Sequence, residues 1–140
     1  MDEIAAGAAV YVDTNIFIYF IEATPGFHDR AVMAFTQLAK KGARINTSEL
    51  TVAECIYLPA REDNWELMAV YDRLFAVTGD VTLLQLTGGV ARRAAIAGGA
   101  MGLKLVDAIH YLSALESGCS HFLTSDSQFK SGPALTVKMV

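Results

Sequence analysis

The sequence is poor in charged residues, in basic residues and in cysteine. Charged residues make up 19% of the 140 residues, and 11 Lys and Arg stand against 15 Asp and Glu, a formal net charge of −4. This balance argues against a protein that binds nucleic acid by electrostatic attraction alone, because such proteins are basic. Hydrophobic residues reach 53%, so residues 1–140 can bury a full core as a single domain.

Cysteine and apolar runs are too sparse for a disulfide scaffold or a membrane span. Cys55 and Cys119 form no CxxC pair and have no zinc-like spacing to a histidine, so we expect free thiols in a reducing compartment. The chain starts with acidic residues and lacks the basic segment of a signal peptide. Asp13 and Glu22 interrupt the best apolar run, which is too short to cross a bilayer. We therefore expect a cytoplasmic protein with no membrane partner.

Short apolar runs alternate with helix-like segments along the whole chain. Periodicity predicts strands at 9–12, 43–46, 80–84 and 121–124, with a fifth at 135–140. It predicts helices at 15–21, 29–41, 48–61, 64–76, 88–97 and 103–117, the fifth of them ended by Gly98-Gly99. This alternation predicts an α/β fold in which helices cover both faces of a central parallel sheet of four to five strands. Residues 1–9 are a candidate for a disordered tail.

Two acidic residues follow predicted strands. In open α/β sheets the functional crevice lies beyond the carboxyl ends of the strands. Asp13 follows the first strand directly, and Asp126 follows the strand at 121–124 after one intervening residue. Either acid alone is also explained as a helix cap that accepts from free backbone N–H groups. Their shared edge of the sheet favours a common site.

Two further acids lie on predicted helices. On helix 103–117, the helical period puts Asp107 opposite an apolar face and beside His110 and Tyr111. A solvated helix face is the alternative for Asp107. The apolar face consists of Leu105, Ala108, Ile109 and Leu112.

Glu54 is the fourth acid, on helix 48–61. Its helical neighbours are Leu50, Tyr57 and Leu58. A carboxylate among such residues should be neutralised, paired or bound to a metal, because burying a free charge is costly. The alternative to a metal site is an ion pair with an arginine such as Arg61 or Arg92. Glu49 points elsewhere on the helix and is expected to be a first-turn acid favoured by the helix dipole.

Four carboxylates in one crevice would repel one another unless a cation joined them. Oxygen ligands without cysteine select hard divalent ions, Mg²⁺ or Mn²⁺, which serve phosphate chemistry. Removing these four acids from 15 leaves 11, which equals the 11 Lys and Arg, so a polyanionic substrate is compatible with the net charge. Basic residues that could hold its backbone, although each is also explained as plain surface, are Arg92-Arg93, Lys104, and Lys40-Lys41 with Arg44.

Four segments, in this order, resemble the PIN domain of metal-dependent ribonucleases: VDTNIFIYF, TVAE, VDAIHYLSAL and LTSDSQF. The resemblance runs from Val10 to the end of the chain, and a lone chain of this length most resembles the VapC-type toxins of toxin–antitoxin pairs. It implies a three-layer α/β/α fold. It also implies an endoribonuclease that uses Mg²⁺ or Mn²⁺ and a metal-activated water to hydrolyse RNA phosphodiester bonds. The implied partners are a small VapB-like antitoxin and a second copy in a homodimer.

The resemblance also assigns roles to residues. The family's acidic quartet, which holds the metal and performs catalysis, falls on Asp13, Glu54, Asp107 and Asp126. Two polar residues, Asn15 and Thr124, fall where the family has groups that orient the acids. His110 lies in the third segment but outside the quartet, and we expect it in the core or at the rim. Ser125 departs from the family, which often has Asn before the last acid.

Three other functions are compatible with these residues. A PIN-like nuclease can process RNA without being a toxin, and a PIN-like module can bind RNA or protein without cutting. A different phosphate enzyme, such as a phosphatase or a DNA nuclease, is a third possibility. An aspartyl-nucleophile hydrolase would usually carry a second acid two residues after Asp13, where Asn15 stands. A nucleotide-binding domain is disfavoured because neither glycine-rich phosphate motif occurs.

Overall fold

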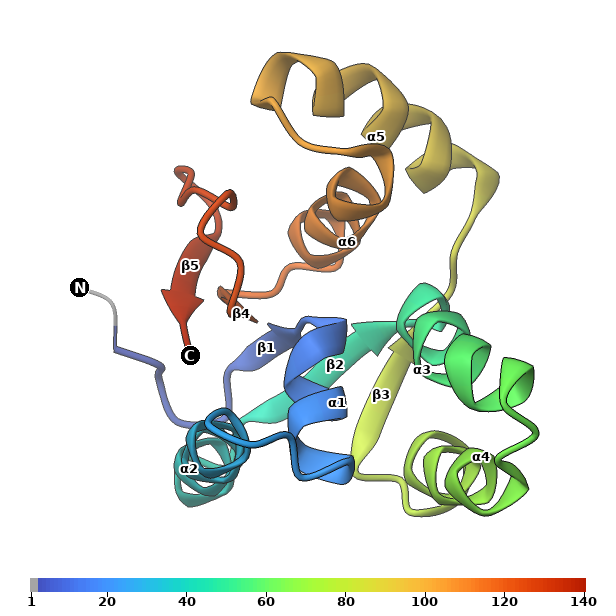
Figure 1. The fold of residues 1–140 in the computed structure, drawn as a ribbon. Helices are drawn as coiled ribbons and strands as arrows, with labels where there is room; N and C mark the ends of the chain where they lie inside the picture. The colour runs from blue at the N-terminus through green and yellow to red at the C-terminus, as the bar shows by residue number, and fades with distance from the viewer. Residues whose placement is uncertain (1–2) are drawn as a thin grey trace.

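The structure, a computed structural model, describes residues 3–140. Its centre is a five-stranded sheet in the order β3-β2-β1-β4-β5 in which every neighbouring pair is parallel (Figure 1). The predicted α/β fold with a parallel sheet is confirmed. The strands are β1 (Ala9–Val12), β2 (Arg44–Ser48), β3 (Val81–Leu84), β4 (His121–Thr124) and β5 (Thr136–Met139).

Helices cover the two faces of the sheet as separate layers. Figure 1 shows α5 and α6 on one side, with α1, α2 and α4 on the other. Because side chains alternate along a strand, Val10 and Val12 enter one core while Tyr11 enters the other. The helices are α1 (Thr14–Ile21), α2 (His28–Lys40), α3 (Glu49–Arg61), α4 (Trp65–Asp72) with the π-helical turn η1 (Arg73–Val77), α5 (Gly88–Met101) and α6 (Leu105–Glu116).

The strand order places a topological switch point at the carboxyl end of β1. The chain passes from β1 to β2 on one side and later returns to β4 on the other, so the connections diverge between β1 and β4. Such switch points are where open parallel sheets bind ligands. Helices α1 and α3 start at this edge, capped by Asp13 and Ser48, whose side chains accept from Thr14 N–H and Leu50 N–H. Glu49 lies in the first turn of α3, as expected.

The predicted end of the fifth helix at Gly98-Gly99 is wrong. Helix α5 continues to Met101, and Gly102, at φ +69°, caps it in the left-handed conformation. Gly98 serves packing instead, because a Cβ there would lie 2.8 Å from the Cβ of Ala108 on α6. The glycine therefore permits the close contact of α5 with α6 rather than ending the helix.

The predicted apolar face of α6 is also partly wrong. Leu105 is 56% exposed, whereas every residue from Ala108 to Ala114 is buried. Helix α6 is enclosed on both faces from Ala108 to Ala114, so His110 and Tyr111 do not form a solvated face.

Part of the expected tail packs on the domain. Ile4 is buried, Gly7 N–H donates to the carbonyl of Lys41, and Glu3 pairs with the Lys41 ammonium at 2.8 Å. Residues 1–2 of that expected tail lie outside the described part of the chain. Both cysteines are free and buried. Over residues 3–140, no helix is long and apolar enough to span a bilayer.

Candidate metal and nuclease site

Asp13 is held by donors from both sides at the carboxyl end of β1. Its Oδ1 accepts from Thr14 N–H at 2.9 Å, and its Oδ2 accepts from the Thr124 hydroxyl at 2.8 Å. Thr124 ends the neighbouring strand β4, and its Oγ1 also accepts from Asp126 N–H at 3.0 Å. One threonine therefore connects the acids that follow β1 and β4.

Glu54 reaches the same place from α3. Its Oε1 accepts from the Thr14 hydroxyl at 2.7 Å and lies 2.6 Å from Nε2 of His110. Thr14 thus contacts both Asp13 and Glu54. The partner of Glu54 is this histidine, and neither Arg61 nor Arg92 pairs with it among the described residues.

The apolar surroundings expected for Glu54 are wrong. Tyr57 and Leu58 are 64% and 52% exposed, because α3 buries the stripe of Thr51, Cys55 and Pro59 instead. Glu54 borders this stripe and faces the polar groups that follow β1. Its carboxylate is therefore placed by hydrogen bonds rather than by apolar contact.

Asp107 faces the other three acids from the first turn of α6. Burial raises its pKa, and the negative charges of Asp126, Asp13 and Glu54 raise it further against the opposing influence of His110. Asp126 is partly buried in a turn in which its Oδ1 accepts from Gln128 N–H at 2.9 Å. Four elements far apart in the sequence thus bring the four predicted carboxylates within electrostatic reach of one another.

Asp13 and Glu54, which both contact Thr14, have pKa values shifted in opposite directions. Burial raises the pKa of Asp13, and this outweighs the lowering by His110, Thr124 and Thr14. Partial burial also acts to raise the pKa of Glu54, but the hydrogen bonds from His110 and Thr14 outweigh it and lower that pKa. Asp13 and Asp107 are therefore the two acids of the cluster whose pKa values are raised.

The donor set fits a hard divalent cation in chemistry. All four groups are carboxylates, and among the described residues His110 is the one basic side chain that lowers the pKa of Asp13, Glu54 and Asp107, so the acids outnumber the basic groups beside them. In the present side-chain positions, no three His, Cys, Asp or Glu residues within 3–140 lie close enough together to hold one metal ion. Asp13 and Glu54 already use three of their four oxygens on protein donors.

His110 lies in the core, as expected, but sequence reasoning missed its contact with Glu54 and the role of Thr14. Thr14 follows Asp13 in the first motif, and His110 lies one helical turn beyond Asp107, so both spacings carried the signal. Asn15, expected to orient the acids, is exposed, and its amide makes no hydrogen bond with the described residues. Ser125 Oγ lies 3.3 Å from the Tyr19 hydroxyl.

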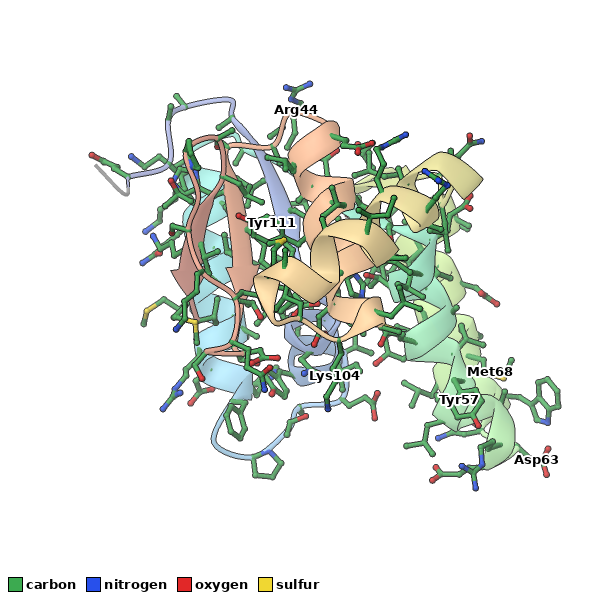
Figure 2. All side chains as sticks on the ribbon, turned by 90° about the horizontal axis from the view of Figure 1, so that it is seen from above. Arg44, Tyr57, Asp63, Met68, Lys104 and Tyr111 are labelled. Atoms are coloured by element: carbon green, nitrogen blue, oxygen red, sulfur yellow. The ribbon has the colours of Figure 1, made fainter. Side chains whose placement is uncertain are left out.

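Most of the basic residues expected near the crevice lie elsewhere. Figure 2 shows Arg44 and Lys104 at opposite ends of the molecule. Arg44 opens β2, just after Lys40 and Lys41, so this group sits at the amino ends of the strands. Arg93 is engaged by Glu116 at 2.5 and 2.6 Å. Lys104, the residue before α6, is exposed three positions from Asp107.

Solved structures with this fold include toxin–antitoxin complexes. VapBC2 from Rickettsia felis bound to a promoter DNA fragment matches with TM-score 0.68 and 18% identity, over 94% of this chain and 98% of that chain. DNA-bound VapBC from Salmonella typhimurium gives 0.69 and 18%, over 94% and 98%. VapC20 from Mycobacterium tuberculosis, a Sarcin–Ricin loop cleaving toxin, gives 0.64 and 16%, over 81% and 86%.

Among curated proteins, no match to this sequence is found. The family model of the PIN domain matches residues 10–134, a span that contains all four carboxylates, both threonines and His110. Nearly the whole chain is covered, and the five-stranded parallel sheet agrees with the solved folds. The chain belongs to the PIN domain family.

Proposed function

We propose that this PIN domain is an endoribonuclease that depends on Mg²⁺ or Mn²⁺ and hydrolyses RNA phosphodiester bonds. The observation that supports the proposal is the acidic cluster at the switch point of the sheet, in which burial, and then the charges of Asp126, Asp13 and Glu54, raise the pKa of Asp107. A protein retains such mutual repulsion where a cation or a substrate relieves it.

The residues of the chain divide into ligands and groups that orient them. Asp13 and Asp107 would be the principal ligands, and Glu54 and Asp126 would complete the site directly or through water. Thr14 and Thr124 fix Asp13 and thereby set the direction of its carboxylate. When bound, the cation supplies positive charge that favours deprotonation of a water and offsets charge developing on the phosphate.

Cleavage of RNA by the purified chain tests the proposal. With Mn²⁺ the protein should cut a mixed-sequence RNA and leave 5′-phosphate and 3′-hydroxyl ends, which fit attack by water without use of the 2′-hydroxyl. Asp13→Asn should abolish cutting while its circular dichroism spectrum stays that of the wild type. Equal cutting by this variant would reveal a contaminating nuclease and remove the support for the proposal.

We further propose that the nuclease is a cytoplasmic toxin held by a small VapB-like antitoxin, and that it forms a homodimer. The solved VapBC complexes share its fold, and large apolar side chains such as Trp65, Ile96 and Leu105 are more than half exposed. A short neighbouring reading frame should encode a protein that co-purifies with the chain and inhibits cutting. A housekeeping nuclease would show no such inhibitor. Light scattering should give twice the chain mass of 15.1 kDa.

A module that binds without cutting is the second candidate. Its support is that Glu54 is already engaged by His110 and that no three ligand groups in residues 3–140 close around one point. Titration with Mn²⁺ separates the two. A nuclease should rise in melting temperature as the metal binds its native state, whereas a module without a metal site should not.

A further inference from the structure

A buried hydrogen-bonded chain lies behind the carboxylates and ends on Glu54. Tyr11 from β1 and His110 from α6 are 0% and 2% exposed. The Tyr11 hydroxyl lies 2.7 Å from Nδ1 of His110, and Nε2 of the same ring lies 2.6 Å from Oε1 of Glu54. Three elements that are far apart in the sequence therefore meet through one imidazole.

The partners of the imidazole decide where its hydrogens are. The Tyr11 hydroxyl lies 2.7 Å from Nδ1, and a phenol O–H can donate to the lone pair of that nitrogen. A bare Nε2 lone pair would face a carboxylate oxygen at 2.6 Å, which is repulsive, so Nε2 carries a hydrogen and donates it to Glu54. In an imidazole with one N–H, the tautomer that satisfies both contacts carries its hydrogen on Nε2 and accepts from Tyr11 at Nδ1.

Both rings of the chain are fixed by packing. Tyr11 stacks on Phe122 of β4 with centroids 5.2 Å apart and planes 4° apart. His110 meets the Tyr11 ring edge-on at 5.9 Å. Around them, Thr47 donates to Thr51 at 2.7 Å, and Thr51 lies 3.2 Å from Thr14. The imidazole therefore cannot turn without disturbing a packed layer.

We propose that Tyr11 and His110 are positioning residues that hold Glu54 by Oε1 and leave its Oε2 to a divalent cation. Oε1 receives Thr14 and His110, while Oε2 has no hydrogen-bond partner among the described residues. A glutamate side chain has several rotatable bonds. Two hydrogen bonds that fix the position of Oε1 therefore also fix the direction in which Oε2 points. Groups of this kind tune metal affinity without touching the metal. The inference rests on the proposed function, because it assigns Glu54 to a cation.

The first test compares two buried tyrosines, of which only Tyr11 contacts His110. Tyr11→Phe removes the donor to His110. Tyr111→Phe is the matched control, because Tyr111 is also buried against Phe122. Its hydroxyl lies 3.3 Å from the Lys130 carbonyl and has no contact with His110 or Glu54. Imidazole ¹⁵N resonances of the metal-free protein should show the Nε2–H tautomer in the wild type and in Tyr111→Phe. Tyr11→Phe should keep this tautomer, because Glu54 still faces Nε2, but its Nδ1 resonance should shift, because the lone pair loses its hydrogen-bond donor.

Metal affinity is the second readout. Calorimetric titration with Mn²⁺ should show a Kd weakened roughly 10–100-fold in Tyr11→Phe and unchanged in Tyr111→Phe. His110→Gln and His110→Leu complete the test if Tyr11→Phe folds poorly. The glutamine amide keeps an N–H for Glu54 and should preserve most of the affinity, whereas the leucine, of similar size, should lose it. If Tyr11 and His110 served only to stabilise the fold, Mn²⁺ affinity would fall in step with melting temperature across all four variants.

Two failures are distinguishable. Wild-type protein that neither binds Mn²⁺ nor cuts RNA would overturn the proposed function and this inference with it. Wild-type protein that binds and cuts, with Tyr11→Phe matching Tyr111→Phe in Nδ1 resonance and in metal affinity, would overturn the inference alone.

Discussion

At the scale of single residues, two threonine hydroxyls organise the acidic cluster. Thr124 donates to Asp13 and accepts from Asp126 N–H, while Thr14 donates to Glu54 and supplies its backbone N–H to Asp13. A hydroxyl can donate and accept at once, so it can join two groups that carboxylates alone could not join. The uncharged threonines therefore help to set the direction of the Asp13 and Glu54 carboxylates.

Thr14→Val removes the hydroxyl but keeps the backbone donor and the side-chain volume. Glu54 then loses its 2.7 Å donor, so we expect Mn²⁺ affinity to fall roughly 10–100-fold. RNA cutting should fall with it at subsaturating metal. Thr14→Ser retains the hydroxyl and should keep near wild-type affinity. Equal affinities of the two variants, measured by calorimetric titration, would show that the hydroxyl has no part in placing Glu54.

Lys104 is the basic residue best placed to hold an RNA backbone beside the cluster. It is exposed and directly precedes α6, whose first turn carries Asp107. Lys104→Ala should raise KM for RNA several-fold with little change in kcat, and it should weaken the salt dependence of binding, because one phosphate contact is lost. Lys40→Ala, at the amino end of the sheet, should change neither. A fall in kcat for Lys104→Ala would instead place this lysine at the reacting phosphate.

The four acids could be found from the sequence because strand ends and helical spacing are local signals. The pairing of Glu54 with His110 could not, since the residues are 56 positions apart and meet only when α3 and α6 pack near β1. The expectation for Lys40 and Arg44 failed for a different reason. Both lie at the amino end of β2, which a parallel sheet puts at the edge opposite the acids.

At the scale of elements, strands were well predicted and one helix end was not. The apolar runs at 9–12 and 121–124 became β1 and β4 with the predicted bounds. Gly98-Gly99 looked like a stop signal because glycine often follows a helix. The structure uses Gly98 for close helix contact and Gly102 for the left-handed cap. A glycine chosen for small size and one chosen for positive φ look alike in a sequence.

The neighbouring glycines of α5 offer an internal control for this contact. A Cβ at Gly98 would lie 2.8 Å from the Ala108 Cβ, whereas one at Gly99 would meet nothing within 4 Å. Gly98→Ala should destabilise the domain by about 1–3 kcal/mol through overpacking. Gly99→Ala should stabilise it by roughly 0.5–1 kcal/mol, because alanine favours an exposed helical position. Urea unfolding measures both. A stabilised Gly98→Ala would mean that α5 and α6 can separate without cost.

At the scale of the whole molecule, strand order brings the site together. Periodicity predicts that strands are parallel but does not say which are neighbours. The order β3-β2-β1-β4-β5 puts β1 beside β4, which joins Asp13 to Asp126. The first core then supports α1 and α3, and the second supports α6. Each acid thus depends on a different element, and the cluster is a property of the complete fold.

The pKa shifts of the acidic cluster should make the stability of the whole domain depend on pH. Burial, with the neighbouring acids, raises the pKa of Asp107 above its ordinary value, so the native state holds this proton more tightly than the unfolded chain. Its contribution to the free energy of unfolding is therefore favourable at low pH and is lost as pH rises from the ordinary aspartate pKa through the raised one. Glu54, with its pKa lowered, contributes in the opposite sense, through stability that is lost on acidification.

Asp107→Asn isolates the Asp107 contribution. Without metal, its melting temperature should match the wild type at acid pH and exceed it by a few degrees at neutral pH, because like-charge repulsion is relieved. With Mn²⁺ at 100 times the wild-type Kd, the wild type should gain about 2.7 kcal/mol and the variant much less, so the order of stabilities reverses. Thermal melts across pH, with and without Mn²⁺, measure this. A variant less stable than the wild type in metal-free neutral buffer would show that Asp107 is structural, and that the acids do not gather under mutual repulsion.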